Sequence, residues 1–353
     1  MDVNKNILVA LSGGVDSSVC VHLLKQQGFN VFAVVLKMSP CHDDTVAAAQ
    51  ASADSLDVPL TVVDMQKEFD EKVITYFVNE YKNGRTPNPC IFCNPLVKFK
   101  ALIETANKLN CDLVATGHYA QTKKNDDGTF SLIRGESLAR DQSYMLYRLG
   151  QKELSRLIFP LSTLQKDEVR SIASKLGLSC ATAPDSQENC FIEDNDYRSY
   201  IENRIGKQAI GDFISPEGKP CGKHKGIINY TVGQRKGLGI ALGQPVFIKK
   251  IDSDKNKIYL AYKGDDIVSQ TKINNLTLIN ENNFYDLNDT QKTLKPPFTA
   301  LVKIRSAATP IKATVAYNST EIATITFDVP QRAVAIGQSL VIYDGKDGLE
   351  VLG

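Results

Sequence analysis

Residues 5–20 constrain this chain more than any other stretch, because they read as a strand, a tight turn and a helix in direct succession. Residues 7–11 are apolar without interruption, which favours a strand buried on both faces, and Gly13 and Gly14 end it before a helical pattern begins. The two glycines let the backbone bend sharply and approach a ligand, and Asp16 lies in the first turn of the helix. Exposed N–H groups and the positive end of the helix dipole favour an anion there. The pattern predicts a phosphate-binding loop.

The residue types in this stretch exclude two common classes of nucleotide-binding loop. No lysine follows the glycines, so the nucleotide loop that ends in Gly-Lys-Ser/Thr is excluded, and the GxGxxG spacing is absent. Ser-Gly-Gly-Val-Asp-Ser from residue 12 instead resembles the pyrophosphate loop of the N-type ATP pyrophosphatases, which cleave ATP between its α and β phosphates. This resemblance implies that the loop holds the pyrophosphate part of ATP, with Asp16 near a magnesium ion. The expected ATP-binding residues of this stretch are Ala10, Leu11, Ser12, Gly13, Gly14, Val15, Asp16 and Ser17.

Composition restricts the class of protein. With 353 residues, the chain exceeds the usual size of one domain, and 42% hydrophobic with 23% charged residues excludes a disordered chain. No apolar run approaches the roughly 20 residues needed to cross a bilayer, and the polar start is unlike a signal peptide. We therefore expect a cytoplasmic protein with no membrane partner. Because the net charge is only +1, a nucleic acid would have to be held by local basic patches.

Strands and helices alternate through the first part of the chain. Strand patterns at residues 31–37, 60–63 and 113–116 alternate with helical patterns at 46–56, 69–81 and 98–109. This alternation indicates a parallel sheet covered on both faces, in which ligands bind beyond the carboxyl ends of the strands. Leu36 and Gly117 lie at two such ends, so we expect both to line the ATP crevice.

The eight cysteines do not form a disulfide framework in a cytosolic chain of this size, so each requires its own interpretation. Cys90 and Cys93 form a C-x-x-C pair that is compatible with a zinc knuckle, a redox pair, an iron–sulfur ligand set or a catalytic thiol. Asn94 and the following proline predict a helix start, which would shift Cys93 toward the thiolate. Cys190 lies in a polar, proline-containing loop, where we expect an accessible thiol.

Six motifs together resemble one family, the tRNA-specific 2-thiouridylases, over nearly the whole chain and in the expected order. They are Ser-Gly-Gly-Val-Asp-Ser-Ser at 12, Thr-Pro-Asn-Pro-x-x-x-Cys-Asn at 86, Thr-Gly-His-Tyr at 116, Asp-Gln-Ser-Tyr at 141, Ser-Gln-x-x-Cys-Phe-Ile at 186 and Tyr-Thr-Val-Gly-Gln-Arg-Lys-Gly-Leu-Gly at 230. The resemblance implies ATP-dependent adenylation of the uracil C2 oxygen of a wobble uridine, followed by displacement of AMP by sulfur.

The resemblance also implies roles for individual residues. Sulfur would arrive as a persulfide on Cys190 from a donor protein, and Cys93 would attack or resolve it. Asn88, Pro89 and Cys90 would contact the target base. Contacts to the anticodon stem-loop of tRNA would come from His118, Arg140, Asp141, Gln142, Arg305, Ser306 and Gln338.

One position departs from the family pattern. Many members carry aspartate where this chain has Cys90, so the acid/base or ligand role of that aspartate cannot be transferred. Together, Cys90, Cys93 and Cys190 resemble the cluster ligands of iron–sulfur-dependent tRNA thiolases. Two versions therefore remain open, a persulfide relay through Cys190 and Cys93 and a [4Fe-4S] cluster on the three thiols.

The pattern changes near residue 197. Residues 203–236 are rich in glycine and carry a local excess of five positive charges, which favours phosphate contact. Alternating apolar and polar residues at 298–304, 311–317, 322–327 and 339–343 are typical of a small antiparallel barrel. We predict an α/β chain of three domains: a parallel-sheet ATP pyrophosphatase domain at 1–198, a small basic linking domain at 199–268 and a C-terminal β-barrel at 269–353.

Two rival functions remain. One is another pyrophosphate-loop ligase or amidotransferase that acts on a small molecule. The other is a non-catalytic tRNA-binding protein that carries sulfur. The basic segment and the cysteine pair argue against the first, and tRNA-dependent release of pyrophosphate would decide between it and the thiolase. Unchanged thiolation in Asp16→Ala would favour the second.

Overall fold

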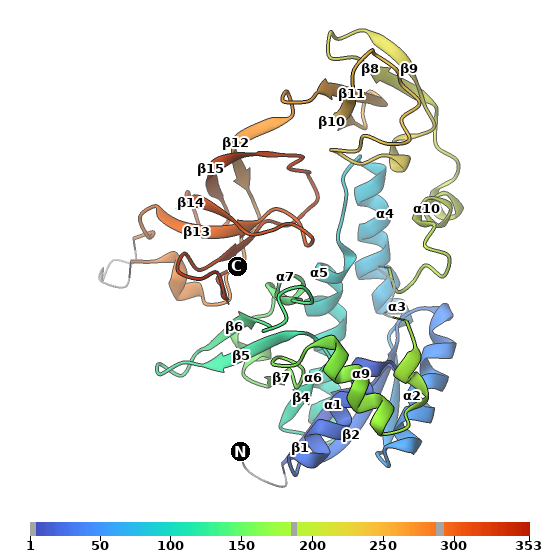
Figure 1. Cartoon of the computed structure of the whole chain (residues 1–353), viewed down its shortest axis with the longest axis vertical. Coiled ribbons are helices and arrows are strands. Elements are labelled where there is room, and N and C mark those ends of the chain that lie inside the picture. The colour runs from blue at the N-terminus through green and yellow to red at the C-terminus, as the bar shows by residue number, and fades with distance from the viewer. Residues whose placement is uncertain (1–4, 185–188, 287–292) are drawn as a thin grey trace.

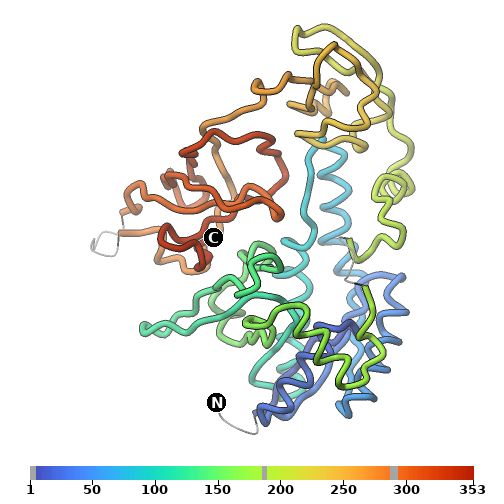
Figure 2. Tube along the Cα trace, viewed as in Figure 1, coloured from blue at the N-terminus to red at the C-terminus, as the bar shows by residue number. Residues whose placement is uncertain are grey.

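The computed structural model describes residues 5–184, 189–286 and 293–353 and contains three sheets. In Figure 1 the first sheet and its helices form the lower part of the molecule, the middle segment lies at the top, and the C-terminal strands lie to one side. The tube in Figure 2 shows that the chain rises to the middle segment after the first sheet and then returns through the C-terminal strands toward that sheet. The predicted fold class is confirmed.

The first sheet has five parallel strands in the order β3-β2-β1-β4-β7. Its strands are β1 (Asn6–Ala10), β2 (Asn30–Lys37), β3 (Leu60–Asp64), β4 (Leu113–Ala115) and β7 (Leu157–Ile158). Because β1 is central and flanked by two parallel strands, its side chains from Ile7 to Val9 are fully buried, as the unbroken apolar run requires.

Nine α-helices are described in this unit, and the longer ones lie close to the ranges expected from the sequence. They are α1 (Val15–Gln26), α2 (Asp43–Ser55), α3 (Gln66–Phe69), α4 (Thr75–Lys82), α5 (Pro89–Cys93), α6 (Phe99–Lys108), α7 (Ser143–Leu146), α8 (Gln151–Leu154) and α9 (Lys166–Lys175). A π-helical turn at Asp70–Ile74 joins α3 to α4, so the helix expected at 69–81 is one continuous helical segment over 66–82.

The middle segment begins with α10 (Tyr197–Ile205) and continues into a four-stranded sheet in the order β10-β11-β8-β9. These strands are β8 (Gly211–Ile214), β9 (Pro220–His224), β10 (Val246–Asp252) and β11 (Lys257–Tyr262). Neighbouring strands are antiparallel except β11 and β8, which are parallel.

The C-terminal strands form an eight-stranded sheet with a hairpin from the first unit. Its order is β12-β15-β14-β13-β16-β17-β6-β5. The strands are β5 (Ala120–Lys124), β6 (Phe130–Arg134), β12 (Ile267–Ile273), β13 (Phe298–Lys303), β14 (Ile311–Tyr317), β15 (Ala323–Arg332), β16 (Val341–Tyr343) and β17 (Glu350–Val351). The hairpin β5–β6 was not expected from the sequence. It joins the sheet where β17 pairs antiparallel with β6.

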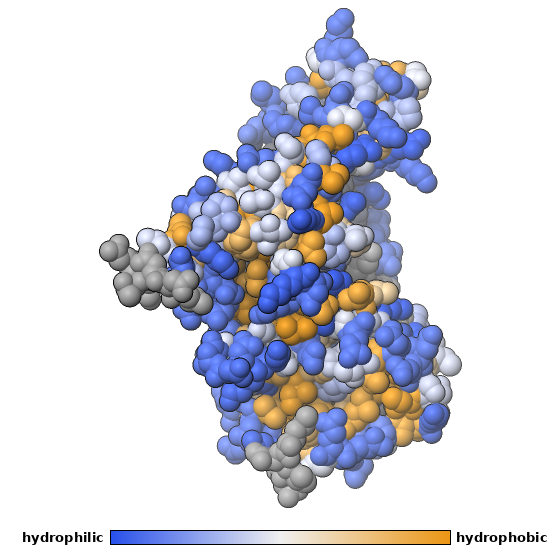
Figure 3. Space-filling view, turned by 60° about the vertical axis from the view of Figure 1, so that its left-hand side comes forward, coloured by the Kyte–Doolittle hydropathy of each residue, from blue (hydrophilic) through white to orange (hydrophobic). Residues whose placement is uncertain are grey.

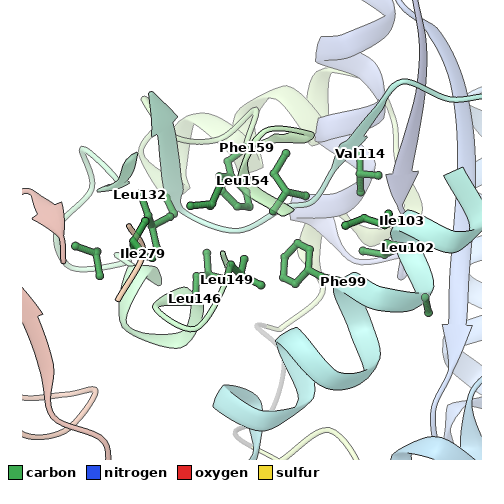
Figure 4. Close-up of a cluster of buried hydrophobic side chains, with 14 of the residues drawn as sticks. Phe99, Leu102, Ile103, Val114, Leu132, Leu146, Leu149, Leu154, Phe159 and Ile279 are labelled. Atoms are coloured by element: carbon green, nitrogen blue, oxygen red, sulfur yellow. The ribbon is translucent and has the colours of Figure 1, made fainter. Parts of the chain in front are cut away.

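The hydrophobic cores also cross the boundaries between the units. One core packs Phe99, Leu132 and Leu149 against Ile279 and Tyr343, which come from the C-terminal part. Figure 4 shows Ile279 beside Leu132, Leu146 and Leu149 in this cluster. A second core combines Phe69, Phe77 and Cys93 with residues of the middle segment such as Phe213 and Ile258. Because buried apolar area is shared, we expect the three units to resist moving independently.

The surface is largely hydrophilic on the face drawn in Figure 3, and apolar side chains show through in a band down the middle of that face. Within the described residues, none of the helices has the length and apolar character to cross a membrane.

Candidate active site

The predicted phosphate loop lies between β1 and α1, at the carboxyl end of the central strand. Gly13 has φ +76°, and a Cβ placed there would collide with the backbone of Ala48 and Ala49 in α2, so only glycine fits. The Ser17 hydroxyl accepts a hydrogen bond from the Ser12 N–H at 3.2 Å and donates to the Gly14 carbonyl at 3.0 Å. These bonds fix the loop while the Ser12 residue itself stays exposed. The arrangement suits an anion at the start of α1.

Leu36 and Gly117 lie at the same edge of the sheet as the loop. Leu36 is near the end of β2, which pairs parallel with β1. Gly117 follows β4 on the other side, and a Cβ there would stand 3.2 Å from Asp16. The structure therefore brings these two residues and the loop to the same edge of the sheet, at the carboxyl ends of the strands.

Asp16 makes contacts that the sequence did not reveal. Both of its carboxylate oxygens accept hydrogen bonds from the Lys166 ammonium at 2.8 Å, and one also accepts from the Tyr119 hydroxyl at 2.9 Å. The Lys166 side chain is only 12% exposed, against 32% for Asp16. Lys166 is the first residue of α9, where no sequence pattern marks it as functional. A half-buried lysine beside a phosphate loop can supply positive charge to a phosphate as well as to a carboxylate.

Replacing Lys166 with methionine tests its contribution. Because a preorganised charge is removed from the phosphate site, we expect ATP-dependent AMP formation to fall about 100-fold. Lys175→Met, which removes an exposed lysine from the last turn of the same helix, is the matched control. A Lys166→Met protein with the AMP formation rate of the control would show that the lysine only neutralises Asp16.

Cys90, Cys93 and Cys190 meet around one small cavity. Its volume is about 40 Å³, and Cys90 and Cys93 line it from α5 while Cys190 lines it from a loop more than 90 residues later. Met38, the residue after β2, and Lys98 also line it. A cavity of this size holds a few water molecules, so it suits a sulfur atom rather than a nucleobase.

The helix that carries the C-x-x-C pair begins earlier than the sequence suggested. Asn88 is the N-cap, and its side chain accepts a hydrogen bond from the Cys90 N–H at 3.2 Å. Pro89, rather than Pro95, is therefore the first helical residue, and Cys93 lies inside a continuous helical segment, because α5 is followed directly by a π-helical turn at Asn94–Lys98 and by α6. The expectation that Cys93 sits at a helix N-terminus and is shifted toward the thiolate is wrong.

Burial controls the acidity of the three thiols. It raises the pKa of Cys93 to about 11 and also raises that of Cys90. Cys190 is exposed as a residue, but its thiol lines the same cavity and its pKa is raised in the same direction. The positive charge of Lys98 acts in the opposite direction on all three. At neutral pH the thiols are protonated in this arrangement, and Lys98 is the nearby cation able to stabilise a thiolate.

Cys190 is exposed as a residue, as expected, and its backbone is tied to the end of β2. His42 accepts the Met38 N–H on Nδ1 at 3.2 Å, which places the ring proton on Nε2, and Nε2 donates to the Cys190 carbonyl at 2.9 Å. The same carbonyl accepts a weaker bond from the Cys41 thiol at 3.8 Å. His42 thus holds the Cys190 loop against the strand end beside the phosphate loop.

Three thiols that line one cavity are candidate ligands for a metal ion or a cluster. Nowhere in residues 5–184, 189–286 and 293–353 do three His, Cys, Asp or Glu side chains group closely enough to hold a metal ion. That finding concerns a single ion; the ligands of a [4Fe-4S] cluster lie further apart, so both the persulfide relay and the cluster remain open for Cys90, Cys93 and Cys190. All eight cysteines are free.

Protein-family models and individual relatives both match nearly the whole length of the chain. Three protein-family models match in succession, described as the tRNA methyl transferase HUP domain over residues 5–194, the tRNA methyl transferase PRC-barrel domain over 198–262 and the aminomethyltransferase beta-barrel domain over 276–353. A protein of Clostridioides difficile named tRNA-specific 2-thiouridylase MnmA is 39% identical over 98% of this chain and 96% of its own length. One of the same name from Lachnoclostridium phytofermentans is 40% identical over 97% of each chain.

The chain belongs to the tRNA-specific 2-thiouridylase family. A solved structure described as a 4-thiouridine synthetase–RNA complex with bound ATP covers 51% of this chain and 43% of its own, at 18% identity and a TM-score of 0.36, which is too distant a likeness to support a conclusion.

The residues expected to contact tRNA in this 2-thiouridylase family member lie in different surroundings. Arg140 and Arg305 are exposed, and Ser306 is half-buried. The Asp141 side chain is only 1% exposed and pairs with Arg134 at 2.8 Å. Gln142 accepts the Tyr119 N–H at 3.0 Å.

His118 is also engaged inside the protein. Its Nδ1 is hydrogen-bonded with the Thr116 hydroxyl at 2.7 Å, and its ring centre lies 5.8 Å from Phe99 and 6.1 Å from Phe159. Burial and the charge of Lys98 lower the pKa of His118 to about 3. The imidazole is therefore neutral at pH 7 and is not a cation for phosphate in this arrangement.

This shift predicts a pH dependence of stability. The unfolded chain binds a proton on this histidine below about pH 6.5, whereas the folded chain does so only near pH 3, so acid favours the unfolded state between these values. Urea unfolding midpoints should fall more between pH 7 and pH 4 for the wild-type chain than for His118→Gln. An equal fall for the two proteins would show that the ring is not held neutral.

Proposed function

We propose that this chain catalyses ATP-dependent 2-thiolation of the wobble uridine of tRNA. The observation that supports this most strongly is the placement of two sites at one edge of one sheet. The phosphate loop follows β1, and the thiol cavity begins at Met38, directly after the neighbouring parallel strand β2. An activated RNA carbonyl and a sulfur-bearing thiol can then meet in one crevice. The names of the relatives, which match over nearly the whole chain, agree with this reaction.

The first step makes a leaving group from an oxygen. The uracil C2 oxygen is a poor leaving group, so it attacks the α phosphate of ATP and pyrophosphate departs. Residues 12–18 would hold the pyrophosphate through backbone N–H groups, and Lys166 would add positive charge. Magnesium, when bound, would neutralise phosphate charge. The partly exposed carboxylate of Asp16 fits such an ion, since oxygen ligands are the ones it prefers.

The second step delivers sulfur. A donor protein loads Cys190 with a terminal sulfur, and this sulfur attacks C2 as AMP leaves. The Cys93 thiolate then attacks the Cys190 sulfur that is still bonded to the product, which releases 2-thiouridine and forms a Cys93–Cys190 disulfide. A dithiol reductant must reduce this disulfide before the next turnover. The cavity shared by the two thiols supports the handover, and Lys98 would stabilise the attacking thiolate.

The RNA contacts of this proposal rest on charge and exposure. Basic side chains of the middle segment, together with exposed Arg140 and Arg305, would bind the phosphates of the anticodon stem-loop, while Asn88, Pro89 and Cys90 would meet the splayed-out base. Two of the basic residues already have partners, because Arg204 pairs with Asp70 at 2.7 Å and Lys223 with Asp212 at 2.6 Å. We propose that the reaction takes place in the cytoplasm, which a tRNA substrate is consistent with.

We also propose the domain division 1–198, 199–268 and 269–353. The family models end and begin near these boundaries, at 194, 198, 262 and 276. The hairpin β5–β6 belongs to the first domain by sequence, and its pairing with β17 is then a contact between domains.

Two alternative reactions, methyl transfer to tRNA and ligation of a small molecule, would give no role to some of the residues of the site. Methyl transfer to tRNA, which the descriptions of two family models name, gives no role to a phosphate loop with a thiol cavity beside it. Ligation of a small molecule gives none to the three cysteines.

The test uses the full chain with ATP, magnesium, unmodified tRNA transcript and a persulfide donor under argon. We expect 2-thiouridine at the wobble position with one AMP for each thiolated tRNA. Pyrophosphate release that needs a small molecule instead of tRNA would favour the ligase. A protein that binds tRNA and accepts sulfur but forms no AMP would be a carrier.

A further inference from the structure

We propose that the C-terminal sheet positions the base-binding segment through a latch between loop residues 336–338 and the backbone of Thr86. This inference deepens the proposed function, because it assigns Gln338 a positioning role in thiolation besides the expected contact with RNA. It begins from two hydrogen bonds that join parts of the chain 250 residues apart. The Gln338 side-chain amide donates to the Thr86 carbonyl at 2.6 Å, and the Thr86 N–H donates to the Ile336 carbonyl at 3.2 Å.

Gly337 makes this contact close. Its φ is +96°, and a Cβ there would lie 2.9 Å from the Arg85 Cβ and 2.9 Å from the Thr86 nitrogen. Any side chain would therefore both strain the loop and push the two segments apart.

The segment held by the latch leads directly to the thiols. Thr86 stands two residues before Asn88, the N-cap of α5, and α5 carries Cys90 and Cys93 at the cavity. α5 continues through a π-helical turn at Asn94–Lys98 into α6, so its C-terminal end is fixed by that helix and the segment before Asn88 holds its N-terminal end. The position of Thr86 thus bears on the position of both thiols.

A second contact reaches the same loop from α7. The Tyr144 hydroxyl donates to the Ser339 carbonyl at 2.7 Å, and the Tyr147 and Ser339 hydroxyls are 3.0 Å apart. Met145, which follows Tyr144 in α7, accepts a hydrogen bond from the side-chain amide of Asn94 on its carbonyl at 2.7 Å. The loop, α7 and the end of α5 therefore form a closed set of contacts.

The C-terminal sheet is itself fixed to the first unit, so the loop is not free to follow α5. β17 pairs with β6, and the buried Arg134–Asp141 pair lies at this junction, with Arg134 over the ring of Tyr343 at 5.5 Å. Asp141 also accepts hydrogen bonds from the Ser143 N–H and hydroxyl, both at 3.1 Å, at the start of α7. Because these contacts join the C-terminal sheet to the segment before α5, a displacement of that sheet on binding RNA would also displace the helix that carries Cys90 and Cys93.

Three variants and one control test the latch. Gln338→Met keeps the length of the side chain and removes the donor, and Gln338→Lys keeps a donor. Gly337→Ala inserts a Cβ into the contact without removing a polar group. Gly264→Ala is the matched control, since Gly264 has φ +109° and nothing within 4 Å of a Cβ placed there.

Two readouts are measured for each protein. The first is the single-turnover thiolation rate at saturating tRNA, together with the Kd for tRNA. We expect Gln338→Met and Gly337→Ala to slow this rate about tenfold, with recovery in Gln338→Lys and with the Kd unchanged in Gly337→Ala. The second is the alkylation rate of Cys90 and Cys93 by iodoacetamide without ATP or RNA, which should rise severalfold in the same two variants and not in Gly264→Ala.

The outcomes separate the latch from its rivals. Weaker tRNA binding with an unchanged saturated rate in both latch variants would show that residues 336–338 act only through binding of RNA and would overturn the proposal. Unchanged alkylation in both latch variants would overturn it too. If the wild-type chain fails to thiolate tRNA, the proposed function fails, but the alkylation comparison still decides whether the latch exists.

Discussion

Asp16→Ala should abolish adenylation of tRNA while leaving tRNA binding nearly intact. Asp16 lies at the start of α1, where its carboxylate is the acidic group of the phosphate loop and is bound by Lys166 and Tyr119. Without it, magnesium loses its proposed protein ligand and Lys166 loses its anchor. We expect the rate of tRNA-dependent pyrophosphate release to fall at least about 1,000-fold.

Two further variants make this result interpretable. Asp16→Asn keeps the shape and can still accept the Tyr119 hydroxyl, so it separates loss of charge from collapse of the loop, and it should be nearly as inactive as Asp16→Ala. Asp44→Ala removes an exposed carboxylate from the neighbouring helix α2 and should behave as wild type. Full pyrophosphate release by Asp16→Asn would contradict the role of the loop.

Removing either thiol should separate adenylation from sulfur transfer. Cys190→Ser cannot be loaded by the donor protein, so we expect a single burst of pyrophosphate and no 2-thiouridine. Cys93→Ser can still be loaded, and its sulfur can attack C2, but the thiol that releases the product is missing. This variant should accumulate RNA bound covalently to Cys190, and dithiothreitol should release that RNA as thiolated product.

The control is Cys221→Ser, because Cys221 lies in β9 of the middle segment and its thiol donates only to the Phe213 carbonyl. Iron analysis of anaerobically prepared protein belongs in the same experiment. Thiolation that follows iron content, together with equal loss of activity in Cys90→Ser, Cys93→Ser and Cys190→Ser and no covalent RNA, would contradict the relay and favour a cluster.

Local sequence signals predicted the first sheet and the edge at which its ligands should lie. The apolar run at 7–11 matches β1, and Gly13 has the positive φ that its place in the motif requires. These features depend on residues close together in sequence, so the residue types suffice to infer them.

The remaining features of the fold and of the site depend on contacts between residues far apart in the sequence, which no local pattern predicts. The hairpin β5–β6 pairs with β17 more than 200 residues later, and Asp141 is buried because of that junction. Lys166 reaches Asp16 from the other end of the unit. A lysine that begins an amphipathic helix and an aspartate in a loop look like ordinary surface residues until the fold brings their partners to them.

The error at Cys93 has a local cause. Both Asn88-Pro89 and Asn94-Pro95 fit a helix start, and the first of them is the one that is used. This choice places Cys93 at the end of α5 among buried apolar residues, where its pKa rises. The six motifs are not affected, although the one that begins at residue 186 lies partly outside the described residues.

The most direct test follows one oxygen atom. A tRNA transcript carrying oxygen-18 at C2 of the wobble uridine is incubated with the wild-type chain, unlabelled ATP and a persulfide donor, and the AMP is analysed by mass spectrometry. If the C2 oxygen becomes the leaving group, each 2-thiouridine formed is matched by one AMP that carries oxygen-18. Thiolated tRNA formed together with unlabelled AMP would contradict activation of the C2 oxygen by ATP.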